Sequence, residues 1–597
     1  MIKKILIANR GEIAVRIVRA CAEMGIRSVA IYSEADRHAL HVKRADEAHC
    51  IGEEPLAGYL NPRKLVNLAV ETGCDALHPG YGFLSENAEL AEICAERGIK
   101  FIGPSAEVIR RMGDKTEARR SMIKAGVPVT PGTEGNVADI HEALTEGDRI
   151  GYPVMLKATS GGGGRGIRRC NSREELEQAF PRVISEATKA FGSAEVFLEK
   201  CIVNPKHIEA QILGDSFGNV VHLFERDCTV QRRNQKVVER APAPYLNSQQ
   251  RDALCQEALT LMQSVGYSHA GTVEFLMDVD SGQFYFMEVN PRIQVEHTVT
   301  EEVTGIDVVK AQIRIAEGGH IGATGETGIP AQADIRLSGH ALQCRITTEN
   351  PENNFIPDYG RISAYRGAMG FGIRVDGGTA YSGAVVTRFY DSLLEKVTAW
   401  AQTPEEAIRR MDRALMEFRI RGVSTNIGFL RGVLADPDFL AGRATTSFID
   451  ERPELLRPHE SADRATKLLQ FLAERTINKP FGDPRTPVVA RSKLPVVDLY
   501  AAPPAGSRQR LLELGPEERT LFEKRVRQGR RPFEPVPVLF ELSEEQIARI
   551  AVNQFRLPGV EVSAQLVRHY PQKERFAHSV GYVGRINEKE LKDLDPT

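Results

Sequence analysis

The sequence predicts an α/β protein with several domains, and three observations support this. The chain has 597 residues, which is long enough for three or more domains. It begins with an apolar run (3–9), a segment of helical periodicity (11–25) and a second apolar run (27–33). Later segments contain pairs of β-rich runs joined by turn-forming residues. Because strand, helix and strand in that order form a βαβ unit, we expect a parallel sheet with helices on its faces.

Composition indicates a cytoplasmic enzyme. A net charge of −3 and a pI near 6.6 give no general attraction to nucleic acid or anionic lipid. The nine cysteines form no CxxC pair, which favours reduced thiols over a disulfide framework or a zinc site. No apolar stretch reaches transmembrane length. We therefore expect no nucleic-acid partner and no membrane partner.

The first βαβ unit is similar to a dinucleotide-binding fold, but it lacks the glycine fingerprint. Its first turn contains only Gly11, where GxGxxG is required, so NAD is excluded. The segment 74–87, CDALHPGYGFLSEN, follows a short strand and is rich in Gly and Pro. Loops in this position commonly carry functional residues.

A glycine-rich segment at 151–170 predicts a phosphate-binding hairpin. A β-rich run ends at Lys157, and Ser160, four glycines, Arg165 and a returning strand follow. Glycines let backbone N–H groups face a phosphate, and the two cations add positive charge. The segment is not a GxxxxGK[ST] loop, which excludes the common NTPase site. A mobile hairpin tip without a ligand is the alternative.

Two acids predict a metal site on a second hairpin. The runs 271–277 and 284–290 flank a turn-rich junction, and a turn centred on Ser281 places Glu274 opposite Glu288. Their Cβ atoms would be about 5 Å apart, and the like charges would repel unless a cation intervened. Carboxylate and amide oxygens suit Mg²⁺ shared with substrate phosphates. The alternative is a solvated hairpin face.

The polar side chains of the next segment alternate. Every second residue is polar in this order: Glu288, Asn290, Arg292, Gln294 and Glu296. If the segment is one extended strand, these five side chains share one face. Such a face is poorly suited to cover a core, so we predict that it lines an active site.

Residues 225–239, ERDCTVQRRNQKVVE, contain seven charged residues. Their alternation predicts one strand, with Gln231 on one face and both Asn234 and Lys236 on the other. A solvated surface strand is the alternative. We expect Cys228 to be a buried, inert thiol.

Seven motifs in order resemble biotin carboxylases of the ATP-grasp superfamily. They are MIKKILIANRGEIAVRI, HPGYGFLSEN, KATSGGGGRG, ERDCTVQRRNQKVVE, FMEVNPRIQVEH, GHALQCRI and FYDSLLEK. The resemblance covers roughly residues 1–450. It implies a Rossmann-like N-terminal α/β domain (1–113), an ATP-grasp domain (114–330) with a lid at about 131–203, and a C-terminal domain (331–450).

The resemblance also implies an activity. MgATP would activate bicarbonate as carboxyphosphate, and the carboxyl group would pass to the ureido nitrogen of biotin. By similarity, Glu274, Glu288 and Asn290 bind Mg²⁺ or Mn²⁺; Lys115, Lys157, Gly162, Gly163, Gly164, Glu199, Lys200, His207 and Gln231 bind ATP; Lys236, Arg292, Gln294 and Val295 bind bicarbonate; and Tyr81 and Arg345 bind biotin. Glu296 would be the general base, acting with Lys236, Arg292 and Arg345. Asn234 and Ser160 depart from the family pattern, where many members have His and Gly.

Two features concern partners. No Met is followed by Lys, so the biotinyl Met-Lys-Met motif is missing and biotin should arrive on another polypeptide. No carboxyltransferase domain is recognised either. We expect a biotin carboxyl carrier, a carboxyltransferase subunit, and a homodimer or higher oligomer.

The remainder predicts a helix and a Pro-rich linker (451–507) and a short α+β tail (508–597). The linker is similar to the connector of pyruvate carboxylases, which favours these over acetyl-CoA carboxylases. The tail resembles the pedestal segment of class B penicillin-binding proteins. Because it has no SxxK serine, we expect no penicillin-binding activity.

Three functions stay open from sequence. The first is a biotin carboxylase. The second is another ATP-grasp ligase that joins a carboxylate to an amine, which should lack the pair Lys236 and Arg292. The third is a non-catalytic scaffold whose tail binds cell-wall machinery, and the intact Glu296 and Lys157 speak against it.

Overall fold

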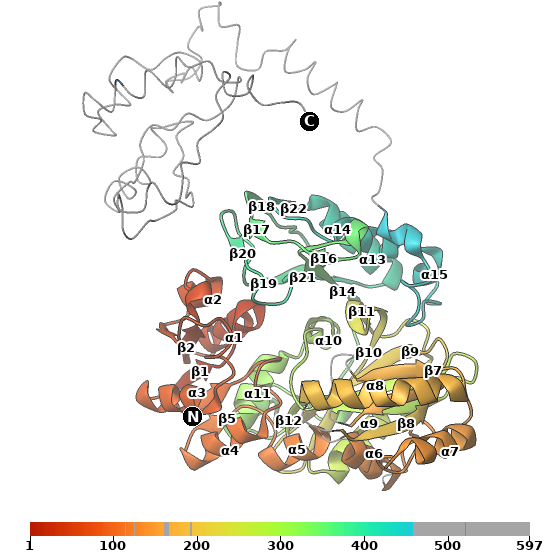
Figure 1. The fold of residues 1–597 in the computed structure, drawn as a ribbon. Helices are drawn as coiled ribbons and strands as arrows, with labels where there is room; N and C mark the ends of the chain where they lie inside the picture. The colour runs from red at the N-terminus through yellow and green to blue at the C-terminus, as the bar shows by residue number, and fades with distance from the viewer. Residues whose placement is uncertain (114, 125, 160–165, 192–193, 458–519, 521–597) are drawn as a thin grey trace, which may run out of the picture. The chain divides into compact units, whose positions relative to one another are not determined.

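The computed structural model describes residues 1–457, except 114, 125, 160–165 and 192–193, and also Thr520 (Figure 1). The chain divides into two compact units, Met1–Ala462 and Asp463–Thr597, and the fold below is that of the first. The predicted linker helix and the predicted tail lie outside the described residues, as do Gly162, Gly163 and Gly164.

The N-terminal region contains the predicted βαβ unit. β1 (Lys4–Ile7), α1 (Gly11–Glu23) and β2 (Arg27–Tyr32) start a parallel five-stranded sheet with the order β3-β2-β1-β4-β5. The other elements are α2 (Leu40–Arg44), β3 (Glu47–Cys50), α3 (Pro62–Glu71), β4 (Ala76–His78), α4 (Ala88–Glu96) and β5 (Lys100–Phe101). The apolar strand residues are buried in two clusters, one on each face of the sheet. This explains why the first run is apolar without alternation.

A small α/β unit occupies the predicted lid region. β6 (Val154–Ala158), β7 (Ile167–Cys170) and β8 (Val196–Lys200) form an antiparallel sheet with the order β7-β6-β8. It has its own core with α7 (Ile140–Ile150) and α8 (Arg173–Phe191), the long helix at the front of Figure 1. The return of the chain after the glycine-rich segment is confirmed, because β6 and β7 pair antiparallel.

A single eight-stranded sheet forms the centre of the molecule. Its order is β13-β12-β9-β10-β11-β14-β21-β19. The strands are β9 (Lys206–Gly214), β10 (Val220–Arg232), β11 (Gln235–Ala241), β12 (His269–Met277), β13 (Phe284–Asn290), β14 (His340–Thr347), β19 (Ile373–Gly377) and β21 (Leu393–Ala401). The pairing of β11 with β14 carries the sheet across the expected domain boundary at 330.

Helices cover both faces of this sheet. α5 (Ala106–Gly113), α6 (Lys115–Lys124) and α9 (Ser248–Ser264) pack on the apolar face at β9, β12 and β13. α10 (His297–Thr304) crosses the opposite face and hydrogen-bonds to residues of β10, β14 and β21. α11 (Val308–Ala316) follows it and packs beside α1.

The C-terminal region encloses the far end of the sheet. The helices α13 (Pro404–Glu417), α14 (Ile427–Ala435) and α15 (Pro437–Leu440) share one core with β14 and β21. Three short antiparallel pairs complete it: β15 (Glu349–Asn350) with β16 (Ile356–Pro357), β17 (Gly360–Arg361) with β20 (Val385–Val386), and β18 (Ala364–Arg366) with β22 (Arg419–Arg421). A short helix, α12 (Thr324–Thr327), precedes this region.

The structure corrects the prediction of one strand over 288–296. Glu274 does lie directly opposite Glu288, as predicted, but β13 ends at Asn290. Pro291 follows, and proline has no N–H group to continue the ladder. Glu296 is already the N-cap residue of α10. The prediction that all five polar residues share a strand face is therefore wrong for Arg292, Gln294 and Glu296.

The prediction of one strand over 225–239 is also wrong. β10 ends at Arg232 and β11 begins at Gln235, so the segment is a hairpin. Arg233 and Asn234 form its turn with φ angles of 48° and 63°. Asn tolerates this left-handed conformation, which explains its presence at 234. As a result Gln231 lies directly opposite Lys236, and the two share one face.

Candidate active site

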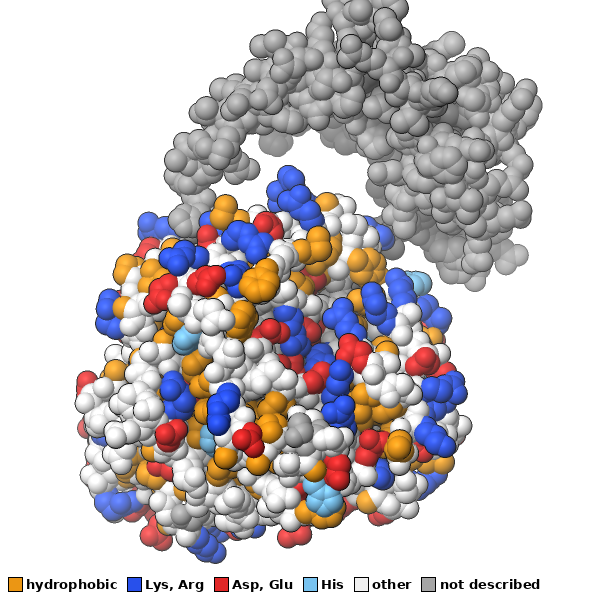
Figure 2. All heavy atoms as spheres, turned by 180° about the vertical axis from the view of Figure 1, so that it is seen from behind, with side chains coloured by type: hydrophobic (Ala, Val, Ile, Leu, Met, Phe, Trp, Pro, Cys, Tyr) orange, Lys and Arg blue, Asp and Glu red, His pale blue; other side chains and the backbone are white. Residues whose placement is uncertain are grey.

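A row of polar residues crosses one face of the eight-stranded sheet. Each member lies directly opposite the next on a neighbouring strand: Glu288 and Glu274, Glu274 and Glu209, Glu209 and Arg226, then Glu239 and Gln343, Gln343 and Thr398, and Thr398 and Arg374. Side chains paired in this way point to the same side of a sheet. α10 packs on this side. Most of this row is buried. Figure 2 shows basic and acidic side chains interspersed on the surface of the described unit.

Lys236 of β11 contacts two acids of this row, Glu209 and Glu274, and also Glu296. Its Nζ is 2.5 Å from Glu209 Oε2, 2.8 Å from Glu274 Oε1 and 2.8 Å from Glu296 Oε1. Burial would lower the pKa of Lys236, but the three carboxylates outweigh it and raise this pKa well above its usual value. The site therefore holds a permanent cation between three acids.

Glu274 is stabilised by more than Lys236. Its Oε2 lies 2.9 Å from His207 Nε2, and its Oε1 accepts hydrogen bonds from Asn290 Nδ2 and Gln294 Nε2, each at 2.8 Å. Burial opposes ionisation, but the Lys236 and His207 interactions hold the pKa of Glu274 well below its usual range. The sequence predicted a cation beside Glu274, and Lys236 supplies part of that positive charge.

Four of the predicted nucleotide residues form two pairs. Lys157 Nζ lies 2.5 Å from Glu199 Oε2, and Gln231 Nε2 lies 3.3 Å from His207 Nδ1. Lys200 instead donates to the carbonyls of Gly151 and Tyr152, at 2.7 and 3.0 Å. Lys115 begins α6, and its side chain lies outside the described residues.

Arg345 approaches Glu296 from the side opposite Lys236. Its Nη2 is 3.1 Å from Glu296 Oε2, whereas Lys236 contacts Oε1. Its Nε lies 2.5 Å from Glu239 Oε1. Burial would raise the pKa of Glu296, but Lys236, Arg345 and Arg226 hold it well below the usual range. Glu296 is accordingly ionised in this arrangement.

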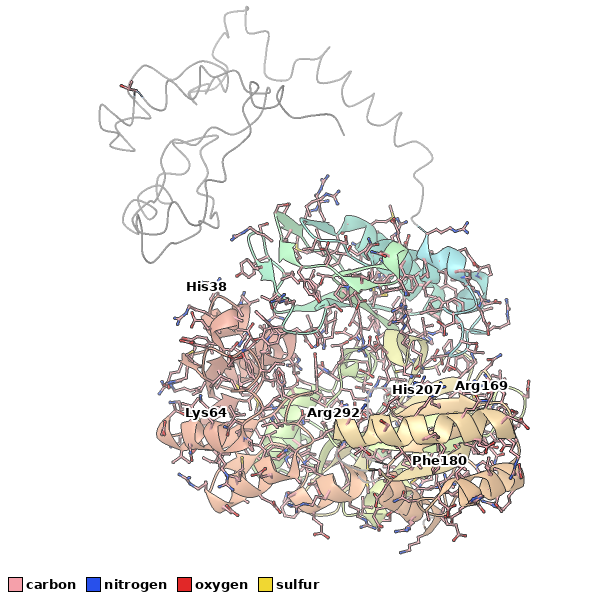
Figure 3. All side chains as sticks on the ribbon, viewed as in Figure 1. His38, Lys64, Arg169, Phe180, His207 and Arg292 are labelled. Atoms are coloured by element: carbon pink, nitrogen blue, oxygen red, sulfur yellow. The ribbon has the colours of Figure 1, made fainter. Side chains whose placement is uncertain are left out.

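Arg292 and the predicted loop 74–87 complete the surroundings. Arg292 Nη2 donates to Asn290 Oδ1 at 2.9 Å, and its Nε lies 3.4 Å from Glu86 Oε1. The ring of Tyr81 lies 5.8 Å from Lys396 Nζ. Figure 3 labels Arg292 and His207, which hydrogen bonds through Asn290 and Glu274 connect.

Arg226 was missed as a site residue from sequence. Its guanidinium is fully buried and makes five hydrogen bonds: to Glu209 Oε1 (2.6 Å), Gln211 Oε1 (2.7 Å), Thr300 Oγ1 (3.0 Å), Thr272 Oγ1 (3.1 Å) and Gln294 Oε1 (2.6 Å). These contacts orient Glu209 toward Lys236 and the amide of Gln294 toward Glu274. Arg226 lies within the charged run Glu225–Asp227, and nothing in that local pattern distinguishes it from its charged neighbours.

Cys228 lies beside the site as a buried thiol. It is buried, as predicted, and its sulfur lies within 4.8 Å of carboxylate oxygens of Glu209 and Glu296. Burial and these acids raise the pKa of its thiol well above the usual value.

Within the part of the chain that the structure describes, no helix has the length and apolar character needed to span a membrane.

Three family matches cover most of the described chain. Residues 1–109 match "Biotin carboxylase, N-terminal domain", residues 114–324 match "Carbamoyl-phosphate synthase L chain, ATP binding domain", and residues 343–451 match "Biotin carboxylase C-terminal domain". A fourth match, "Penicillin-binding Protein dimerisation domain", covers 439–596 and so includes the tail.

Known proteins agree with the first three matches. Mitochondrial pyruvate carboxylase of Mus musculus is 50% identical over 525 residues, covering 86% of this chain and 44% of that protein. The chain thus spans less than half the length of such relatives. The complete multifunctional pyruvate carboxylase of Rhizobium etli is 53% identical with a TM-score of 0.68, covering 80% of this chain and 43% of that one.

A solved structure covers the relevant part completely. The biotin carboxylase domain dimer of Hydrogenobacter thermophilus 2-oxoglutarate carboxylase, in complex with MgADP, ADP and bicarbonate, is 49% identical with a TM-score of 0.74. The alignment covers 77% of this chain and 100% of that domain. The chain therefore belongs to the biotin carboxylase family of ATP-dependent carboxylating ligases.

Proposed function

We propose that this chain uses MgATP and bicarbonate to carboxylate biotin carried on another polypeptide, as the biotin carboxylase part of a pyruvate carboxylase. One observation carries the proposal: Glu296 is held between two cations, Lys236 at Oε1 and Arg345 at Oε2. Each cation can exchange Glu296 for an anionic ligand. The carboxylate then lies between the two ligands that must react.

Bicarbonate would bind at the Lys236 side. Lys236 and Arg292 supply positive charge, and Gln294 and the Val295 backbone supply hydrogen bonds. These groups offset the negative charge gathered by bicarbonate and the nucleotide phosphates. When Lys236 turns to a bound anion, the pKa of Glu296 should rise, because one of its compensating charges has been diverted. Glu296 then becomes a stronger base for the bicarbonate proton.

The opposed acids fit a divalent cation. Glu274, Glu288 and Asn290 supply oxygen donors, which Mg²⁺ or Mn²⁺ prefers, and the ion would neutralise nucleotide phosphates when bound. The nucleotide itself would contact Lys115, Lys157, Glu199, Lys200, His207, Gln231 and the glycines 162–164. Lys157 would exchange part of its contact with Glu199 for phosphate oxygens.

Biotin would approach from the Arg345 side. Glu239 anchors one edge of the Arg345 guanidinium, which leaves the other edge to exchange Glu296 for a developing negative charge on the ureido oxygen. Tyr81 lies on the loop beside this site. The carrier and the carboxyltransferase would be supplied by partners in the cytoplasm, with pyruvate as acceptor and this chain at least dimeric.

We propose three domains for this part of the chain: residues 1–113, residues 114–330 with a lid at about 131–203, and residues 331–450. A lid role for 131–203 is supported by its separate sheet and core. The tail after 508 is proposed to take no part in catalysis.

ATP cleavage by the purified chain tests this function. We expect release of ADP to require bicarbonate and to accelerate with free biotin, with labelled bicarbonate appearing in carboxybiotin. Equal ATP cleavage with and without bicarbonate would contradict the proposal. Transfer of the carboxyl group to pyruvate, after addition of carrier and carboxyltransferase from a pyruvate carboxylase, would test the acceptor.

A further inference from the structure

The segment between β13 and α10 is held by buried side chains instead of a strand ladder. His297 Nδ1 lies 2.7 Å from the carbonyl oxygen of Gln294. Lys396 Nζ donates to the carbonyl oxygen of Val295 at 2.8 Å. A carbonyl oxygen only accepts, so Nδ1 of His297 must carry the hydrogen. Two consecutive peptide groups are thus hydrogen-bonded by side chains of two different elements, His297 of α10 and Lys396 of β21.

Both side chains are fully buried, and their surroundings fix them further. Lys396 Nζ lies 3.1 Å from Glu12 Oε1 of α1, and it is 5.8 Å from the Tyr81 ring. His297 Nε2 lies 3.8 Å from Glu301 Oε2. Burial, together with the charge of Lys396, lowers the pKa of His297 to about 3, so the ring is neutral and keeps its Nδ1 hydrogen across the physiological range.

The two contacts determine the direction of neighbouring groups. The peptide that contains the Gln294 carbonyl also contains the Val295 N–H. The next peptide joins the Val295 carbonyl to Glu296. Fixing both carbonyls therefore fixes the Val295 N–H and the Cα from which the Glu296 carboxylate extends. A hydrogen bond to a carbonyl also polarises its peptide and strengthens the opposite N–H as a donor.

We propose that His297 and Lys396 are positioning residues of the bicarbonate site, which orient the Val295 N–H and the Glu296 carboxylate by holding the peptides on either side of Val295. This inference rests on the proposed function. A purely structural role would instead lower stability, or the amount of active protein, without a selective effect on bicarbonate.

Paired substitutions in the full chain separate these roles. His297→Leu removes the donor, whereas His297→Asn places an amide N–H near the position of Nδ1. Lys396→Met removes the second donor, and Lys396→Arg retains one. The matched control is His41→Leu: His41 is also fully buried and its Nε2 lies 3.2 Å from the Ile31 carbonyl, in the N-terminal sheet. Each variant is measured for the KM of bicarbonate, the KM of ATP, kcat and Tm.

We expect His297→Leu and Lys396→Met to lower kcat/KM for bicarbonate by about 10²-fold, the usual effect of losing one oriented donor. The KM of ATP should stay within about twofold, His297→Asn and Lys396→Arg should recover most of the loss, and His41→Leu should leave kcat/KM for bicarbonate unchanged. Equal loss for ATP and bicarbonate, unchanged kinetics in folded variants, or failure of both Leu and Met variants to fold would overturn the inference.

The wild-type chain distinguishes this inference from the proposed function. If wild-type protein cleaves ATP without any need for bicarbonate, the proposed function fails. If wild-type protein requires bicarbonate and the variants match it, only the positioning inference fails.

Discussion

Lys236 Nζ lies 2.8 Å from Glu296 Oε1. The two residues come from different elements, since Lys236 is on β11 and Glu296 caps α10. Their contact brings the proposed base next to the proposed anion-binding cation. It exists because the β10–β11 hairpin turns Lys236 onto the polar face of the sheet and α10 begins above that face.

Glu296→Gln should lower bicarbonate-dependent turnover by about 10²-fold or more, because an amide cannot accept the proton that a carboxylate accepts. The substitution keeps the size of the side chain. It also keeps one of the two oxygen acceptors that Lys236 and Arg345 contact. Nucleotide affinity, measured by calorimetry, should stay near the wild-type value. A variant with nearly normal turnover would remove Glu296 from the mechanism.

Glu288→Lys should abolish ATP-dependent activity while the protein still folds. The new ammonium would face Glu274 across β12 and β13, where opposite charges attract, and would occupy the space proposed for Mg²⁺. Circular dichroism and thermal unfolding check the fold, and ADP release checks activity. Glu288→Gln is the matched control, because it removes the negative charge, keeps one oxygen donor and adds no cation, and it should retain more activity at high Mg²⁺. Unchanged activity in Glu288→Lys would show that Glu288 does not take part in metal binding.

Arg226→Met should destabilise the protein by about 3–5 kcal/mol, because Glu209 would lose one partner of a fully buried ion pair. Arg226→Lys should not restore stability, since an ammonium cannot reproduce the five hydrogen bonds of the guanidinium. Urea denaturation provides the measurement. The exposed pair of Arg37 and Glu34 offers a control, and Arg37→Met should leave the midpoint nearly unchanged.

Stability should depend on pH through Glu12. Burial raises its pKa from 4.5 to about 7, although Lys396 opposes this. Between those values the folded state binds a proton that the unfolded state releases, so this group lowers stability as pH rises through the window. Glu12→Gln should remove this dependence. The free energy of unfolding of Glu12→Gln minus that of the wild type, measured by urea denaturation, should increase by up to about 3 kcal/mol from pH 4.5 to pH 8. A constant difference across this range would contradict the prediction.

Local pattern was enough to predict several features. The βαβ start and the hairpin of β6 and β7 follow from short-range periodicity and turn residues. Glu274 does pair with Glu288 as predicted, but the register next to the turn, Met277 with Phe284, differs by one residue from the predicted one. A register shift between Glu274 and Phe275 brings the two acids opposite each other. The resemblance to biotin carboxylases came from ordered motifs and is confirmed by the comparisons.

Only the tertiary structure decided how the site is assembled. Arg226 and Gln294 are 68 residues apart, and Lys396 and Val295 are 101 residues apart, yet each pair is in hydrogen-bond contact. Sequence periodicity shows which side chains share a face of one element, but it does not show which faces of distant elements meet. That choice depends on burying the apolar faces of the whole chain together. For this reason the pairing of Glu274 with Glu288 was predictable from the sequence, whereas the role of Arg226, which holds Glu209 and Gln294 from the interior, was not.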